Sequence, residues 1–221
     1  MIQVILCDDH ALIRRGIRDT LADAADIQVV GEAGDYGELR ALLRGLAAVG
    51  ESGHATRCDV LVLDINLPGR SGLDVMHALK DEGSPVKVLV VSMYPEDQYA
   101  IRALRAGAYG YVNKGGDPQL IVQAVRTVAQ GRKYVTPEIA QMLVESLTAP
   151  SVENAYDKLS DREMQTLVMI ASGKRLSDIA EDLTLSPTTV SVYRARVLEK
   201  LGLQNNSELT VYAIRKGLVG S

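Results

Sequence analysis

The stretch VLVLDINLPG, residues 60–69, decides the fold of the first part of this chain. Val60–Leu63 is an unbroken apolar run, which indicates a strand buried on both faces, because a half-exposed strand alternates apolar and polar residues. The run ends at Asp64, and a Pro-Gly turn follows at residues 68–69. A buried carboxylate without a partner is costly, so its place at the end of a strand needs a chemical reason.

Similar apolar runs recur along the first 130 residues, at residues 2–7, 27–30, 60–63, 86–91 and 109–112. Segments with helical periodicity lie between them, and residues 47–57 have no clear period and predict a loop. In HALIRRGIRDTLADA, residues 10–24, we expect the apolar residues to form one stripe: Leu12, Ile13, Ile17 and Leu21. Five strands alternating with five helices predict an α/β fold with a doubly wound, five-stranded parallel sheet.

Length and composition set outer bounds on the kind of protein. A chain of 221 residues suits one domain of ordinary size and a smaller one, and 47% hydrophobic residues are ordinary for a soluble globular protein. No stretch approaches the roughly 20 apolar residues of a membrane span, and MIQVILCDDH reaches charge too early for a signal peptide. We therefore expect a cytoplasmic protein with no membrane partner. Cys7 and Cys58 lie in apolar runs, which predicts reduced core thiols.

Charge is distributed unevenly along the chain. The net charge of −4 argues against a wholly basic nucleic-acid binder. From Tyr156 onward, nine Lys and Arg stand against eight Asp and Glu, a net charge of +1, whereas the part before it carries −5. This asymmetry predicts two parts with different partners.

Chemically active side chains follow four of the five predicted strands. They are Asp8 and Asp9 after the first, Asp64 after the third, Ser92 after the fourth and Lys114 just beyond the fifth. Because the carboxyl ends of parallel strands lie on one edge of a sheet, we expect these five residues to converge.

Three acids, a hydroxyl and an ammonium suit one kind of chemistry. Clustered carboxylates need a cation, and an all-oxygen site with open water positions suits Mg²⁺. A carboxylate held by a metal can attack a phosphoryl group and form an acyl phosphate. Lys114 and Ser92 can then bind the added phosphate oxygens. We therefore predict that Asp64 is a phosphoacceptor.

Residues 1–130 resemble the receiver domain of two-component response regulators, which has a flavodoxin-like fold. The motifs CDDH, LDINLPGRSG, VSMY and GYVNK stand in the family's order and spacing. The resemblance implies that Asp64 takes a phosphoryl group from a sensor histidine kinase or a phosphotransfer protein. It also implies that Mg²⁺ is bound by Asp9, Asp64 and the backbone carbonyl of Asn66, with Asp8 helping through water.

The resemblance places an aromatic switch at Tyr111, three residues before Lys114. We expect phosphate on Asp64 to draw in Ser92, and Tyr111 to fill the space that the serine leaves. A plain core tyrosine is the alternative for this position. Many receivers carry proline directly after the lysine, whereas this chain has Gly115, which predicts a looser loop there.

The last third of the chain is helical in pattern. Ser160 and Glu163 predict a capping box, Gly173 predicts a helix end, and Ser186-Pro187 predicts the start of the next long helix. The short segment LSDIAEDL and the connection TLS come before that long helix. Two helices joined by about three residues predict an all-α helix-turn-helix domain over residues 156–221, after a linker at 131–155 that holds one short helix.

Helical phase predicts which side of residues 187–201 faces a partner. Val190, Arg194, Val197 and Leu201 share one side, and the opposite side is polar or small. The candidate DNA contacts are Thr188, Ser191, Val192 and Arg196 toward base edges, with Arg194 and Lys200 toward phosphates. A solvated amphipathic helix is the alternative.

Residues 156–217 resemble the LuxR-type helix-turn-helix of the NarL/FixJ class, on the motifs LSDRE, LSPTTVSVYRARVLEKLGL and SELTVYAI. Common members have lysine at the place of Ser191 and histidine at that of Tyr193. Because the net charge is only +1, we expect DNA binding by a homodimer on paired half-sites, promoted by phosphorylation. The chain is thus predicted to regulate transcription on double-stranded DNA, with RNA polymerase as a further candidate partner.

The sequence is also compatible with three other functions. The first is a Mg²⁺-dependent phosphatase with an aspartyl nucleophile, which usually has a second acid where this chain has Asn66. Because that acid is missing, we expect no enzyme beyond slow loss of its own phosphate. The second is a constitutive DNA-binding or scaffold protein that is never phosphorylated, and the third is a small-molecule-sensing regulator.

Overall fold

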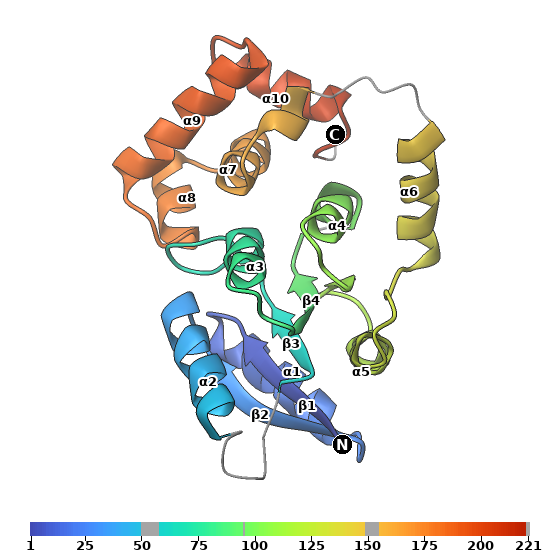
Figure 1. Ribbon diagram of the computed structural model, residues 1–221. Coiled ribbons are helices and arrows are strands. Elements are labelled where there is room, and N and C mark those ends of the chain that lie inside the picture. Colours follow the sequence, from blue (N-terminus) through green and yellow to red (C-terminus); the bar gives the residue numbers. More distant parts are fainter. Residues whose placement is uncertain (50–57, 95, 149–154, 220–221) are drawn as a thin grey trace. The chain divides into compact units, whose positions relative to one another are not determined.

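The computed structural model describes residues 1–49, 58–94, 96–148 and 155–219 (Figure 1). Contacts within the chain form two compact units, Met1–Thr148 and Ala149–Ser221. The loop predicted at 47–57 lies outside the described residues, except that its first three residues end a helix. Within the described part of the chain, every helix is too short or too polar to cross a membrane.

The first unit is built on one parallel sheet. Its strands are β1 (Ile2–Cys7), β2 (Ile27–Ala33), β3 (Val60–Leu63), β4 (Lys87–Ser92) and β5 (Gly110–Asn113), in the order β2-β1-β3-β4-β5. All neighbouring strands pair in parallel. The strand order reverses direction between β1 and β3, which is the point where such sheets bind ligands. The predicted doubly wound sheet is confirmed.

Helices follow the strands in alternation. They are α1 (Ala11–Ala22), α2 (Tyr36–Val49), α3 (Gly72–Asp81), α4 (Glu96–Arg105) and α5 (Pro118–Ala129). Helices α1 and α5 pack together against the sheet, where their apolar residues join those of β1, β3 and β4 in one buried core. Because β3 is covered on both faces, all four of its side chains are buried, as its unbroken apolar run predicts.

The predicted apolar stripe on α1 needs one correction. Ile17 and Leu21 are buried, but the side chain of Leu12 is 86% exposed. Leu12 lies about 100° around the helix from Ile13, so it points away from the buried face. The prediction was therefore wrong for Leu12, because a hydrophobic residue next to a stripe is not always part of it.

Part of the predicted linker is attached to the first unit. Helix α6 (Pro137–Thr148) packs against α4, and its Ile139 is fully buried. The hydroxyl of Thr136 donates to Glu96 Oε2 at 2.8 Å, and the N–H of Tyr134 donates to the carbonyl of Tyr109 at 2.7 Å. These contacts fasten residues 134–148 along α4 and β5.

The second unit is helical. A 3₁₀ turn, η2 (Ala155–Lys158), precedes α7 (Asp161–Ala171), α8 (Leu176–Asp182), α9 (Pro187–Leu201) and α10 (Asn206–Arg215). The predicted capping box between Ser160 and Glu163 is present, and the side chain of Ser186 accepts from Thr189 N–H at the start of α9. The short α8 packs against α9, and α9 packs against α7. The predicted helix-turn-helix arrangement is confirmed.

Candidate functional site

Acidic and basic side chains meet at the carboxyl edge of the sheet. Lys114, which follows β5, places its Nζ 2.6 Å from Asp8 Oδ2 and 2.8 Å from Asp64 Oδ2. All three side chains are buried. The structure thus brings together residues that are up to 106 positions apart in the chain, because the strands before them are parallel members of one sheet and end at the same edge.

A second set of contacts surrounds the turn after β1. Asp8, Asp9, His10 and Asp64 each offer a ligand atom, and these atoms all lie within 4.8 Å of one another. The N–H of His10 donates to Asp8 Oδ1 at 2.8 Å, and His10 Nδ1 lies 2.7 Å from Asp9 Oδ1. His10 is therefore a local contact of the acidic site.

Arg14 supports this turn, a role that sequence reasoning missed. Its Nη1 donates to the carbonyl oxygen of Asp8, and its Nε donates to Glu32 Oε2 at 3.1 Å. Glu32 belongs to β2, so the guanidinium ties the end of β1 to the neighbouring strand. Local sequence patterns carry no signal for this contact, because it depends on strand pairing.

Burial raises the pKa of Asp64 from its ordinary value of 3.8 to about 6. Loss of solvation is the largest cause, and the negative charge of Asp8 adds to it, while Lys114 and the backbone N–H of Asn66 oppose it. One ammonium among these carboxylates leaves the cluster short of positive charge. The donors are oxygen atoms from carboxylates, which is the set that Mg²⁺ prefers, so the residues fit this ion.

The loop after Asp64 is shaped by the start of α3. Ser71 caps that helix by accepting from the N–H of Asp74, and the Asp74 carboxylate accepts from the N–H of Ser71. Asn66 pairs with Ser71 in an isolated antiparallel bridge. The cap and the bridge hold the backbone of Asn66 close to Asp64.

Ser92 and Tyr111 both contact Tyr94, and a hydrogen bond also joins their side chains. Ser92, the last residue of β4, is fully buried and accepts from the N–H of Tyr94 at 3.2 Å. Tyr111 is also fully buried, and its hydroxyl donates to the carbonyl oxygen of Tyr94 at 2.7 Å. Burial raises the pKa of Tyr111, so its hydroxyl remains a donor. The aromatic ring of Tyr94 stacks on that of Tyr99 of α4, with ring centroids 4.6 Å apart.

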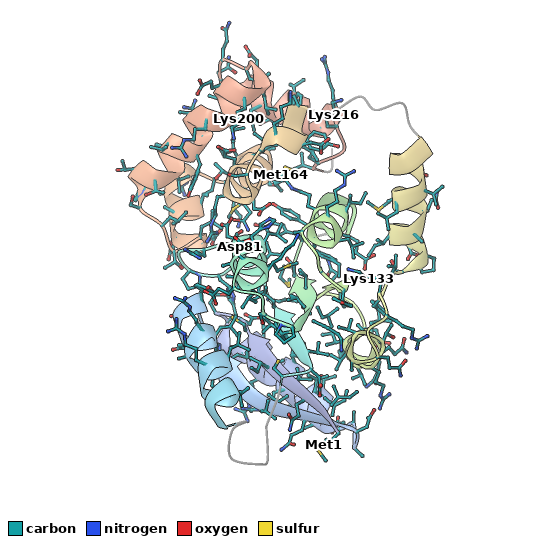
Figure 2. All side chains as sticks on the ribbon, viewed as in Figure 1. Met1, Asp81, Lys133, Met164, Lys200 and Lys216 are labelled. Atoms are coloured by element: carbon teal, nitrogen blue, oxygen red, sulfur yellow. The ribbon has the colours of Figure 1, made fainter. Side chains whose placement is uncertain are left out.

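In the second unit, α9 presents an exposed side with the predicted character. Four of the residues predicted to contact DNA are exposed there: Thr188, Ser191, Val192 and Arg196. The two residues predicted to contact phosphate have partners within this unit: Arg194 Nε donates to Asn206 Oδ1 at 2.6 Å, and Lys200 Nζ lies 2.6 Å from Glu163 Oε2. Figure 2 labels Lys200, which lies on α9. Helical phase alone did not reveal these contacts, because their partners belong to other helices.

The two units match two protein families. Residues 4–126 match the response regulator receiver domain, and residues 157–213 match the bacterial regulatory proteins of the luxR family. The chain is 39% identical over 219 residues to the response regulator GacA of Pseudomonas protegens, covering 99% of this chain and 98% of GacA. It is 38% identical over 219 residues to the response regulator UvrY of Escherichia coli K12, and this match covers 99% of this chain and 96% of UvrY.

Solved structures of response regulators are similar over nearly the whole chain. The structure of RcsB from Salmonella enterica serovar Typhimurium, bound to promoter rprA with the phosphomimetic BeF3-, has a TM-score of 0.61 and 26% identity. It covers 96% of this chain and 97% of RcsB. The response regulator ChrA of a heme-sensing two-component system has a TM-score of 0.51 and 30% identity, covering 99% and 98%.

These similarities confirm the resemblance on which the sequence-based prediction of function rests. A receiver domain precedes a LuxR-type DNA-binding domain, in the same order as in relatives that match from end to end. The chain therefore belongs to the two-component response regulators of the NarL/FixJ class, which are transcription regulators.

Proposed function

We propose that Asp64 accepts a phosphoryl group from a sensor histidine kinase or a phosphotransfer protein, and that this promotes dimerisation and sequence-specific DNA binding. The observation that carries the proposal is the position of Lys114 between Asp8 and Asp64 at the switch point of the sheet. In this proposal residues 1–130 are the phosphoacceptor domain, 131–155 the linker and 156–221 the DNA-binding domain.

Phosphoryl transfer needs a carboxylate with a cation beside it. An oxygen of the ionised Asp64 attacks the phosphorus, the P–N bond of the donor phosphohistidine breaks, and the imidazole leaves with that electron pair. Lys114 already contacts Asp64 Oδ2, so its ammonium is placed to pair with the oxygens of the new acyl phosphate. The Ser92 hydroxyl supplies a further donor from the end of β4.

Mg²⁺ would be held by Asp8, Asp9, Asp64 and the backbone carbonyl of Asn66. When bound, it neutralises negative charge on the phosphoryl oxygens. The donor set supports this assignment, because Asp8, Asp9 and Asp64 offer carboxylate oxygens close to one another and Lys114 is the cation that pairs with two of them.

Tyr94 supports the proposed switch. If the Ser92 hydroxyl turns toward phosphate, it no longer accepts a hydrogen bond from the N–H of Tyr94. The carbonyl oxygen of Tyr94 is also the acceptor for the hydroxyl of Tyr111. In this proposal, phosphate on Asp64 changes the hydrogen bond between Ser92 and Tyr94, and the backbone of Tyr94 carries that change to the Tyr111 hydroxyl.

DNA contacts are assigned first to the exposed side of α9. Thr188, Ser191, Val192 and Arg196 are exposed there, whereas Arg194 and Lys200 contact phosphates only if they exchange their present partners. One solved structure describes two RcsB dimers bound to two parallel DNAs, which supports a dimer for this chain as well. We place the protein in the cytoplasm and infer RNA polymerase as a further partner at promoters.

Intact mass spectrometry with a small phosphoryl donor and Mg²⁺ tests the proposal. Wild type is expected to gain one phosphoryl group, Asp64→Asn none, and the exposed control Asp19→Asn the same as wild type. DNA binding at one stated salt concentration and light scattering follow on the same samples. Tighter binding and a dimer, each only with phosphate, are expected. A wild type without an adduct, or a phosphorylated protein that remains monomeric, contradicts the proposal and favours a constitutive DNA-binding protein.

A further inference from the structure

Asn113, the last residue of β5, joins the two loops that follow β4 and β5. Its Nδ2 donates to the carbonyl oxygen of Tyr94 at 2.9 Å, and its Oδ1 accepts from the N–H of Gly115 at 2.7 Å. Only this orientation of the amide satisfies both partners, since one is an acceptor and the other a donor. One side chain therefore ties the loop after Ser92 to the loop that carries Lys114.

The carbonyl oxygen of Tyr94 is shared between two donors. It accepts from Asn113 and also from the hydroxyl of Tyr111, at 2.7 Å, so both of its lone pairs are used. The N–H of Tyr94 donates to Ser92 Oγ at 3.2 Å. The buried hydroxyl of Tyr111 thus donates to a carbonyl group that Asn113 restrains.

Gly115 completes this arrangement. A proline, which many receivers carry directly after the lysine, has no N–H and could not donate to Asn113. A Cβ at position 115 would lie 3.1 Å from Asn113 Oδ1, which is a tight contact. Glycine supplies both the donor and the space, so the amide of Asn113 restrains this loop through a hydrogen bond that proline could not make.

We propose that Asn113 is a positioning residue that holds Tyr111 in its buried orientation and couples this orientation to the loop of Lys114. Describing Tyr111 as a switch rests on the proposed function, but the effect of Asn113 on Tyr111 requires only the bonds above. When the bond from Asn113 is lost, the Tyr94 carbonyl loses one of its restraints, and the acceptor of the Tyr111 hydroxyl is held less firmly. Loss of one such bond corresponds to a change in population of about 3- to 10-fold.

Fluorine NMR of the full chain labelled with 3-fluorotyrosine tests this inference, with the Tyr111 signal assigned by Tyr111→Phe. A soluble paramagnetic agent reports the exposure of each tyrosine. In wild type we expect a Tyr111 signal that the agent hardly broadens. In Asn113→Leu we expect a shifted signal whose broadening is about 3- to 10-fold greater, in proportion to the exposed population. The control Gln123→Leu, on the exposed side of α5, is expected to leave the signal as in wild type.

Gly115→Pro provides a second variant, which removes the N–H partner of Asn113 Oδ1 and adds a Cβ about 3.1 Å from that oxygen. It is expected to shift the Tyr111 signal in the same direction as Asn113→Leu but by a smaller amount. The double variant should shift the signal no further than Asn113→Leu alone, because both changes remove the bond between Gly115 N–H and Asn113 Oδ1. An unchanged Tyr111 signal in Asn113→Leu or in Gly115→Pro, in a protein that unfolds at the wild-type urea concentration, overturns the inference.

Intact mass of the same samples separates the two claims. If Asp64 of wild type takes no phosphoryl group while Asn113→Leu shifts Tyr111, the proposed function fails and Asn113 keeps its positioning role. If both proteins are phosphorylated and the Tyr111 signals coincide, the role of Asn113 fails and the proposed function stands.

Discussion

Gly72 packs so closely on the backbone of Asp64 that a Cβ at position 72 would lie 2.2 Å from the carbonyl oxygen of Asp64. The N–H of Gly72 donates to the carbonyl of Ile65 at 2.7 Å, so the first residue of α3 is bonded to the loop that follows the proposed phosphoacceptor. A side chain at position 72 must therefore displace backbone at the site itself.

Gly72→Ala is accordingly expected to cost about 1–3 kcal/mol of the free energy of unfolding, since the obstructing atoms are backbone and cannot rotate away. It is also expected to slow phosphoryl uptake at Asp64. The matched control is Gly16→Ala on α1, where a Cβ would meet nothing within 4 Å. That change should stabilise the helix by roughly 0.5–1 kcal/mol. Urea unfolding measures both, and equal stabilities of the two variants would contradict this account.

Asp64→Asn is expected to stabilise the metal-free protein. The pKa of Asp64 is about 6 in the folded protein, against its ordinary value of 3.8, which we take for the unfolded chain. Between these pH values the folded state binds more protons than the unfolded state, so wild type loses stability as the pH rises from about 4 to 6. Above pH 6 the loss is complete, and the asparagine variant should exceed wild type by about 2–3 kcal/mol. Urea unfolding with a chelator at pH 4, 5 and 7 measures the difference. A constant difference across this range would show that Asp64 is not the titrating group.

Both thiols are expected to be poorly reactive in the folded protein. Burial raises the pKa of Cys7 to about 12, with Asp8 and Asp64 adding to the effect, and burial raises that of Cys58 to about 12 as well. Because only the thiolate reacts, alkylation at pH 8.5 should be at least about 100-fold slower than in denaturant. Stability should fall above pH 9, where the unfolded thiols ionise and the folded ones do not. Each of the variants Cys7→Ser and Cys58→Ser leaves one thiol, so the alkylation rate of each cysteine can be measured by itself. An alkylation rate in the folded protein equal to that in denaturant would contradict the burial of that thiol.

Arg196 and Lys200 are expected to differ although both are cations on α9. Arg196 is exposed, so Arg196→Gln should weaken DNA binding and reduce the salt slope by about 0.9 per protomer without changing stability. Lys200 pairs with the buried Glu163, so Lys200→Gln should cost about 1 kcal/mol of stability and alter the salt slope little. Salt titrations of DNA binding and urea unfolding of both variants test this. A reduced salt slope in Lys200→Gln together with a loss of stability in Arg196→Gln would refute the assignment.

The pH dependence of the Lys200 contact follows from its partner. Desolvation alone would raise the pKa of Glu163, but the hydrogen bond from Lys200 and those from Ser160 outweigh it and lower the pKa. The contribution of this pair is therefore present above the ordinary pKa of glutamate and is lost as pH falls below it. In Lys200→Gln the loss of stability on acidification should be smaller than in wild type, which thermal unfolding at pH 3.5, 4.5 and 7 measures.

Local sequence determined the secondary structure and the composition of the site. The unbroken apolar run of β3, the capping pair Ser160–Glu163 and the Ser186-Pro187 start of α9 are signals between near neighbours, so the sequence pattern was enough to predict them. Parallel strands also bring the residues after them to one edge whatever the details of packing, which is why Asp8, Asp64 and Lys114 could be predicted to meet.

The tertiary structure decided which of these groups touch and how closely. Pairing of β1 with β2 brings Glu32 within hydrogen-bond distance of Arg14, and the close approach of α3 to Asp64 leaves no room for a Cβ at Gly72. Packing of α9 against α7 brings Lys200 into contact with Glu163. The two hydrogen bonds of the Asn113 side chain follow in the same way. Each of these contacts joins parts that are distant in sequence or depends on the direction of one side chain. Periodicity, which reports only which face of an element is apolar, carries no information about either.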